Sequence, residues 1–241
     1  MQDIIGAMAK ANEYLEYRKK GEEPFHLVDA VREFGFESLE EYFRAKRDYE
    51  FSKLEFEIIN ADSPQACVKD IFNVITNKRT AVIFVNIDQT LVWTQENSGC
   101  NVEYCAENNI PIIPVGATGT GTLVSTQNDF GIGICVPKDS RFDLEYLVNG
   151  FIKIFRKYTD KEVVNQGNDI MYDGKKICGF TYYDTGDMFM VISPLSFSEK
   201  VGLVTNICTN KPQVKQVGYI DFMNRDMIRE EVERWLRVQL S

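Results

Sequence analysis

The chain has 241 residues, an ordinary composition for a globular protein, and a formal net charge of −9. This length suffices for one sizeable core, or for one domain with an appendage. The acidic balance argues against nucleic acid as the main partner. No apolar run approaches the ~20 residues of a membrane-spanning helix, and the N-terminal stretch MQDIIGAMAKANEYLEYRKK is too polar for a signal peptide. We therefore expect a cytoplasmic protein that does not use a membrane.

Histidine and cysteine usage narrows the possible chemistry. His26 is the sole histidine; it lies on a predicted helix, where we expect a structural role, so most histidine-based zinc sites and triads are excluded. Six cysteines are present with no CxxC pair and no metal-ligand spacing, at positions 67, 100, 105, 135, 178 and 208. We expect them to be reduced and mostly buried in the core.

Residues 1–52 are predicted to be helical. Ile4, Met8, Ala11 and Leu15 recur at helical spacing, a second helix over 25–34 ends before Gly35, and a capping box at 38–41 starts a third helix that runs to about residue 53. These helices predict an N-terminal extension, over residues 1–52, that packs on the main domain or serves a partner.

From residue 53 onward the pattern alternates between strands and helices. Leu54, Phe56 and Ile58 alternate with glutamates and predict a half-buried strand. The run AVIFVNI from Ala81 predicts a strand that is covered on both faces, and residues 89–95 are predicted to be its hairpin partner. Further helices are predicted at 64–77, 101–108, 143–158, 198–207 and 225–239, and further strands at 110–115, 131–136 and 187–192.

A loop rich in glycine and threonine runs from Gly116 through Thr118, Gly119, Thr120 and Gly121. The backbone N–H groups of such a loop can approach an anion. It is not a Walker loop, because no Gly-Lys-Ser/Thr follows, and its glycine spacing does not fit a dinucleotide fingerprint. On its own it is either a turn or a phosphate-binding loop.

The most informative stretch is 167–179, GNDIMYDGKKICG. Asp173-Gly174 predicts a two-residue hairpin turn. Alternation places Lys176 and Cys178 on one face of the returning strand, and Gly179 leaves room there for a ligand. A lysine on an inner face beside Asn168 and Asp169 suits the binding of an anionic group, although a plain hairpin with two lysines is the alternative.

The spacing Asn-Asp-Ile followed by Gly-x-Lys-Ile-x-Gly resembles the signature of the lipoate–protein ligase family, relatives of the biotin ligases. The resemblance covers roughly residues 53–240, with the family's glycine-rich loop on 115–123 and its later substrate segment on 190–195. It implies an α+β catalytic domain of the class II synthetase-like type, with a mixed sheet, over residues 53–241.

The resemblance also implies roles for individual residues. Lys176 would be catalytic, contacting the acyl carbonyl and the phosphate of a lipoyl-adenylate. Asp169 would also be a candidate ligand for Mg²⁺. The substrate or nucleotide would be bound by Gly116, Thr118, Gly119, Thr120, Gly121, Asn168, Asp169 and Gly179. ATP with Mg²⁺, lipoate or octanoate as substrate, and a lipoyl domain or H-protein as acceptor complete this expectation.

Three departures from the family pattern affect phosphate binding. Val115-Gly116 stands where the family has an arginine pair, Gly167 where it has an arginine before Asn-Asp, and residues 191–194 lack the family's His-Gly-Thr. Backbone amides and threonine hydroxyls do not reproduce the bidentate grip of arginine on phosphate. Lys175, Lys176, Lys211 and Lys215 are candidates for a compensating basic patch.

Three functions follow from this combination. The first is a lipoate–protein ligase or related acyltransferase in which Lys176 stabilises developing negative charge. The second is a cysteine-dependent octanoyltransferase with Cys208 as thioester nucleophile, although Cys208 lacks that branch's Pro-Cys-Gly context and an evident base. The third is a non-catalytic binding or assembly module on the same fold.

Overall fold

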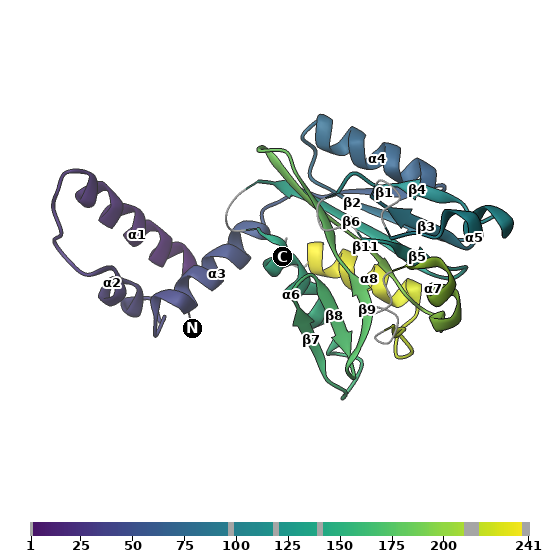
Figure 1. Cartoon of the computed structure of the whole chain (residues 1–241). Helices are drawn as coiled ribbons and strands as arrows, with labels where there is room; N and C mark the ends of the chain where they lie inside the picture. Colours follow the sequence, from purple (N-terminus) through teal and green to yellow (C-terminus); the bar gives the residue numbers. More distant parts are fainter. Residues whose placement is uncertain (1, 96–98, 118–120, 139–141, 210–216, 238–241) are drawn as a thin grey trace. The chain divides into compact units, whose positions relative to one another are not determined.

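The computed structural model describes residues 2–95, 99–117, 121–138, 142–209 and 217–237. Contacts divide the chain into two compact units (Figure 1). Among the described residues, the smaller unit comprises 2–54 together with 236–237, and the larger unit is Glu55–Trp235. No helix among the described residues is long and apolar enough to cross a membrane.

The smaller unit contains three helices, α1 (Ile4–Lys19), α2 (Leu27–Glu33) and α3 (Leu39–Phe51). Side-chain caps start two of them: Asp3 accepts a hydrogen bond from the amide of Gly6, and Ser38 accepts one from the amide of Glu41. The helices share a core of buried side chains drawn from all three of them and the α2–α3 connection, namely Ala7, Ala11, Val31, Phe36 and Tyr42. The helical character predicted for this region is confirmed.

The larger unit is built on an eight-stranded mixed sheet in the order β1-β2-β6-β11-β9-β8-β7, with β10 paired to β11. The strands are β1 (Glu57–Ala61), β2 (Ala81–Asn86), β6 (Phe130–Pro137), β7 (Val163–Gln166), β8 (Asp169–Tyr172), β9 (Lys175–Gly179), β10 (Thr181–Asp184) and β11 (Met188–Leu195). Only β1 and β2 pair in parallel; the other pairs in this sheet are antiparallel.

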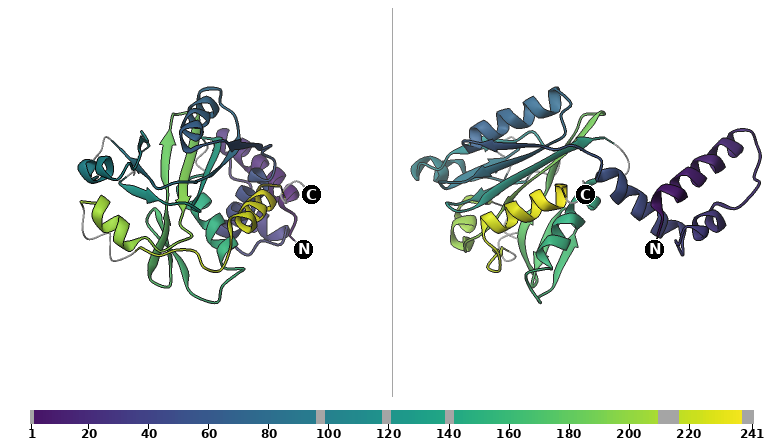
Figure 2. Two further views of the ribbon diagram at one scale, coloured as in Figure 1. Left: turned by 90° about the vertical axis from the view of Figure 1, so that its right-hand side faces the viewer. Right: turned by 180° about the vertical axis from the view of Figure 1, so that it is seen from behind.

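Helices cover both faces of this sheet (Figures 1 and 2). On one face, α4 (Pro64–Thr76) buries Cys67, Ile71 and Val74 against β2, β6 and β11. On the other lie α6 (Leu144–Phe155) and α8 (Arg225–Arg237), where Arg229 stands over the ring of Phe84 on β2. Helices α6 and α8 approach closely, since a Cβ atom at Gly150 would meet the Trp235 ring. The predicted α+β class with a mixed sheet is confirmed.

A second, three-stranded sheet has the order β4-β3-β5, formed by β4 (Ile112–Pro114), β3 (Leu91–Thr94) and β5 (Leu123–Ser125). The short helices α5 (Val102–Glu107) and α7 (Val201–Ile207) pack beside it. The prediction that 89–95 forms a hairpin with the strand from Ala81 is wrong: β3 pairs with β4 and β5, and β2 pairs with β1 and β6. All four residues of β3 are buried, and Trp93 donates a hydrogen bond to the Ser125 hydroxyl at 2.9 Å, which fixes β3 to the second sheet.

Candidate active site

The hairpin predicted at Asp173-Gly174 forms between β8 and β9. Asp173 has φ 50° and Gly174 φ 75°, the pair of positive values that a tight two-residue turn requires. The register shifts between Ile170 and Met171, so that Lys176 pairs with Met171 while Cys178 pairs with Ile170. Ile177 is therefore the extra residue of a β-bulge, a feature that redirects neighbouring side chains.

Lys176 and Asp169 form an ion pair on this hairpin. The Lys176 Nζ atom lies 2.8 Å from Asp169 Oδ1, and the two side chains are 32% and 35% exposed. Gly179 lies directly beneath the pair: a Cβ atom there would be 2.7 Å from both Lys176 Nζ and Asp169 Oδ1. The glycine that closes the sequence motif therefore makes space for the ion pair.

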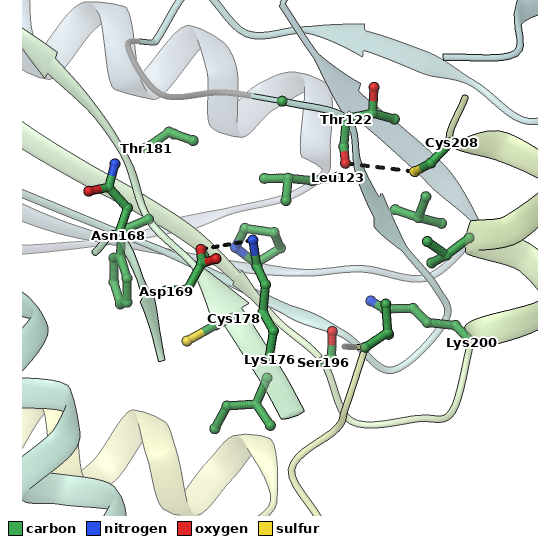
Figure 3. A pocket seen from close by; sticks show the side chains of 18 residues that line it. Thr122, Leu123, Asn168, Asp169, Lys176, Cys178, Thr181, Ser196, Lys200 and Cys208 are labelled. Carbon is green, nitrogen blue, oxygen red and sulfur yellow. Dashed lines mark hydrogen bonds and ion pairs between the residues drawn. The ribbon is translucent and has the colours of Figure 1, made fainter. Parts of the chain in front are cut away.

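The ion pair opens into a cavity of about 290 Å³ (Figure 3). Lys176 projects into it from β9, with Asn168, Asp169 and Gly179 beside it. The opposite side is lined by Gly121, Thr122, Leu123 and Val124. The β11–α7 region contributes Ser196, Lys200, Val204 and Cys208. The cavity thus joins the lysine hairpin to the end of the glycine- and threonine-rich loop.

Other residues predicted from the sequence either lie outside the described residues or do not line the cavity. Thr118, Gly119 and Thr120 lie outside the described residues. Gly116 does not line the cavity; it lies near Tyr183, whose hydroxyl would be 4.0 Å from a Cβ atom at that position. Of the basic patch expected from sequence, Lys175 is exposed next to Gly218, and Lys211 and Lys215 are outside the described residues.

Cys208 lines the cavity at the end of α7, with its Sγ atom 3.9 Å from the carbonyl oxygen of Thr122. It forms an isolated β-bridge with Cys100, whose Sγ lies 3.8 Å from Cys105 Sγ. Burial raises the pKa of the Cys208 thiol, and the nearby Lys176 ammonium opposes that shift. Because the nucleophilic form of cysteine is the thiolate, this environment favours the unreactive neutral thiol.

A second, apolar pocket adjoins the cavity and shares Leu123, Thr181 and Pro194 with it. Its remaining lining is almost entirely apolar and includes Cys67, Ile71, Val85, Trp93 and Ile192. The pocket encloses about 30 Å³, which is room for one or two water molecules. The site therefore combines a polar chamber around Lys176 with a narrow apolar recess.

Lys200 and its partner Asp129 were not predicted from the sequence. Lys200 Nζ lies 2.6 Å from Asp129 Oδ2, and the two side chains are 6% and 0% exposed. They are 71 positions apart, and neither belongs to a motif. The one sequence feature that pointed to this pair is the polar Asn128-Asp129 segment before β6, and such a segment is typical of an ordinary turn.

No group of three or more His, Cys, Asp or Glu side chains in the described part of the chain is placed to hold a metal ion. Asp169 is the one carboxylate among the described residues that line the cavity. Mg²⁺ is commonly held by one or two carboxylates together with substrate phosphates, so the cavity fits Mg²⁺ only together with a phosphate-bearing ligand.

Comparisons with known proteins identify the family. Residues 69–228, which is 160 of the 241 residues, match the model of the lipoyl protein ligase A/B catalytic domain. The chain belongs to this family. A search of curated protein sequences found no match. The matched range includes the β8–β9 hairpin that carries Asp169 and Lys176.

Solved structures show the same fold at low sequence identity. A lipoate protein ligase of Thermoplasma acidophilum with bound lipoic acid superposes with a TM-score of 0.61 at 12% identity, covering 78% of this chain and 86% of that one. The bipartite ligase of the same organism, described with its E2 lipoyl domain, has a TM-score of 0.64 at 12% identity, covering 78% of this chain and 84% of that one. A lipoate-protein ligase A with bound ATP has a TM-score of 0.60 at 13% identity, covering 78% of this chain and 84% of that one.

Proposed function

We propose that this protein activates lipoate or a related medium-chain fatty acid as an acyl-adenylate and transfers the acyl group to a lysine of an acceptor protein. The observation that carries the proposal is the placement of the Lys176 ammonium in a cavity that adjoins an apolar pocket. A carboxylic acid with an aliphatic tail needs both a cationic head site and an apolar recess.

In the first step the carboxylate oxygen of the acid attacks the α-phosphorus of ATP, and pyrophosphate leaves. In the second step the amine of the acceptor lysine attacks the acyl carbonyl, AMP leaves, an amide forms and the amine loses a proton. The Lys176 ammonium forms an ion pair with Asp169 and has N–H donors to direct at the carbonyl oxygen. A fixed cation at that point stabilises the negative charge that develops in the transition state.

Asp169 and Asn168 have supporting roles in this proposal. The Asp169 carboxylate orients the Lys176 ammonium through their 2.8 Å contact, and Asn168 presents an amide at the same wall of the cavity. Mg²⁺, when bound with the nucleotide, would neutralise phosphate charge, and Asp169 is the described side chain that would hold it.

The volume of the apolar pocket limits the length of the acyl tail that the substrate can have. At about 30 Å³ it does not hold an eight-carbon chain without movement of its lining side chains. Leu123 is positioned to provide that movement, because it lines both the cavity and the apolar pocket. We propose that displacement of Leu123 joins the two spaces when the acid binds.

The acceptor we propose is a lipoyl domain or a protein of that type. One structural neighbour is a lipoate protein ligase described together with its E2 lipoyl domain, and the fold around the cavity is shared with it. We also propose that the reaction takes place in the cytoplasm.

The decisive experiment combines the protein with ATP, Mg²⁺, lipoate or octanoate, and a lipoyl domain, and follows the acceptor mass. We expect acyl transfer by the wild type, loss of at least a hundredfold with Lys176→Ala, and near wild-type rates with the matched control Lys175→Ala. Absence of adenylate, of transfer and of thermal stabilisation by the ligands would leave a non-catalytic binding module as the better description.

The thioester route is a second candidate because Cys208 lines the same cavity. It requires Cys208 to displace a thiol from an acyl thioester donor and to carry the acyl group before transfer. The test is the intact mass of the protein after incubation with octanoyl thioester. An acyl adduct on the wild type that is missing from Cys208→Ser would establish this route, and its absence from both would exclude it.

A further inference from the structure

Two cationic side chains enter the cavity, and only one of them belongs to the family's hairpin motif. Among the described lining residues the cations are Lys176 on β9 and Lys200, which immediately precedes α7. Figure 3 shows the two side chains reaching into the same space from different elements. No arginine is present among those lining residues.

Lys200 is held in place by a deeply buried carboxylate. Asp129 Oδ2 accepts hydrogen bonds from Lys200 Nζ at 2.6 Å and from the amide of Thr126 at 2.9 Å, while its Oδ1 accepts from the amide of Phe197 at 3.0 Å. The carboxylate therefore ties the β5–β6 connection to the segment that leads into α7. This carboxylate holds the ammonium end of the Lys200 side chain in place.

The Lys200 ammonium has donor capacity that this pair does not use. An ammonium group has three N–H donors, and within the described residues its one hydrogen-bond partner is Asp129. Its side chain is only 6% exposed, so bulk water has little access to these donors. Burial lowers the pKa of Lys200, and the Asp129 carboxylate opposes that shift. A buried cation with unused donors at the wall of a cavity is a binding group for an anionic oxygen.

We propose that Lys200 is a phosphate-binding residue of this cavity, contacting a phosphate oxygen of the nucleotide whose acyl-phosphate end meets Lys176. This inference rests on the proposed function only in taking the cavity as the nucleotide site. In the proposed function the acid's carboxylate meets Lys176, and a multiply charged phosphate chain needs a second cation, so a phosphate oxygen is favoured over a carboxylate for Lys200.

The test removes the Lys200 charge without leaving Asp129 as an uncompensated buried charge. The double variant Lys200→Met/Asp129→Asn replaces the ion pair by neutral groups, an exchange that buried pairs often tolerate. Lys157→Met is the matched control, because Lys157 also faces a buried carboxylate, Glu231, at 2.7 Å but does not line the cavity. If the double variant does not fold, Lys200→Gln, which keeps a hydrogen-bond donor for Asp129, is compared with Lys157→Met instead.

Binding of ATP, inorganic pyrophosphate and octanoate is measured calorimetrically for each protein, with thermal unfolding as the check on folding. We expect ATP and pyrophosphate to bind ten- to a hundredfold more weakly to the folded Lys200 variants, as for the loss of a charge-assisted hydrogen bond. Octanoate affinity should change less than threefold, and Lys157→Met should bind all three as the wild type does. Weaker pyrophosphate binding at unchanged unfolding temperature excludes a purely structural role.

Three results would overturn the inference: unchanged ATP and pyrophosphate binding by the variants, loss of octanoate binding alone, or absence of phosphate binding by the wild type. The outcome is separable from that of the proposed function. Adenylate formation with Lys200-independent phosphate binding refutes only the role of Lys200. Lys200-dependent phosphate binding without any acyl-adenylate refutes only the proposed reaction.

Discussion

At the scale of single residues, Gly179 is the position where one methyl group should alter the cavity most. A Cβ atom there would lie 2.7 Å from Lys176 Nζ and from Asp169 Oδ1, so the ion pair must move. Gly179→Ala should therefore reduce acyl transfer at least tenfold, since small displacements of catalytic groups have large effects on rate, with a loss of unfolding free energy of about 1–3 kcal/mol.

The matched control is Gly202→Ala in α7, where a Cβ atom meets nothing within 4 Å. This change should leave activity intact and raise stability by up to about 1 kcal/mol, because alanine favours a helix over glycine. Rates and urea unfolding curves are measured for both variants. Equal activity of the two alanine variants would show that Gly179 does not position Lys176.

Cys135 on β6 gives a second expectation at this scale, for alkaline pH. Burial raises the pKa of its thiol from 9.0 to about 12. Above pH 9 the unfolded chain releases this proton while the folded chain retains it. The folded state then binds more protons, so the stability present below pH 9 is lost as the pH rises toward 12. At pH 10 the loss amounts to about 1 kcal/mol for one such thiol.

Cys135→Ala removes this titration. Its cavity should lower stability at both pH values, but the decrease between pH 8 and pH 10 should be about 1 kcal/mol smaller than in the wild type. Urea unfolding under reducing conditions at the two pH values measures this difference. Parallel decreases in the two proteins would mean that the Cys135 thiol ionises in the folded state as readily as in the unfolded chain.

At the scale of elements, local patterns predicted which segments are helices and strands better than they predicted strand partners. The helix predicted from residue 64 is α4, where the Ser63 hydroxyl accepts a hydrogen bond from the amide of Ala66. The pattern at 89–95 correctly indicated a strand, but its partners are β4 and β5, the latter about 30 residues away. The hydrophobic period of a segment indicates which of its residues are buried, but it does not indicate which distant strand pairs with it.

The candidate site shows the same division between local and distant information. The hairpin that carries Asp169, Lys176 and Gly179 is contiguous in sequence, and its turn and glycine are recognisable. The Lys200–Asp129 pair joins segments 71 positions apart. A lysine in a polar segment is normally solvent-exposed, so its burial follows only from the packing of the β11–α7 segment on the β5–β6 connection.

The contact between α6 and α8 depends on Glu231. This carboxylate is 3% exposed and accepts hydrogen bonds from Lys157 Nζ at 2.7 Å and the Tyr158 hydroxyl at 2.9 Å, with Arg234 as a further partner. Glu231→Gln keeps the shape but removes the charge. It should lower the unfolding free energy by about 1–3 kcal/mol, because charge-assisted hydrogen bonds are replaced by weaker ones around a buried group.

Glu230→Gln on the same helix is the control for this change, because Glu230 is exposed. This substitution should change the unfolding free energy by no more than about 0.5 kcal/mol. Thermal and urea unfolding of the two variants provide the comparison. If both glutamine variants unfold like the wild type, α8 is retained by its apolar contacts alone, including the close approach of Trp235 to Gly150.

At the scale of the whole molecule, the smaller unit has a core of its own. Its buried cluster, Ala7, Ala11, Val31, Phe36 and Tyr42, consists only of residues from the first three helices and the α2–α3 connection. The described residues that line the cavity, by contrast, all belong to the larger unit. We therefore expect the helical extension to unfold without loss of ligand binding by the larger unit.

Val31→Asp in the full chain tests this expectation, because an unpaired carboxylate in an apolar core costs several kcal/mol. Leu15→Asp is the control, since Leu15 is exposed on α1. Val31→Asp should abolish protection of α1–α3 from hydrogen exchange, whereas amide protection in β6 and β11 and the affinity for pyrophosphate should match those of Leu15→Asp. A fall in pyrophosphate affinity with Val31→Asp alone would show that the helical unit is required for the cavity to form, and the extension would then be part of the binding machinery.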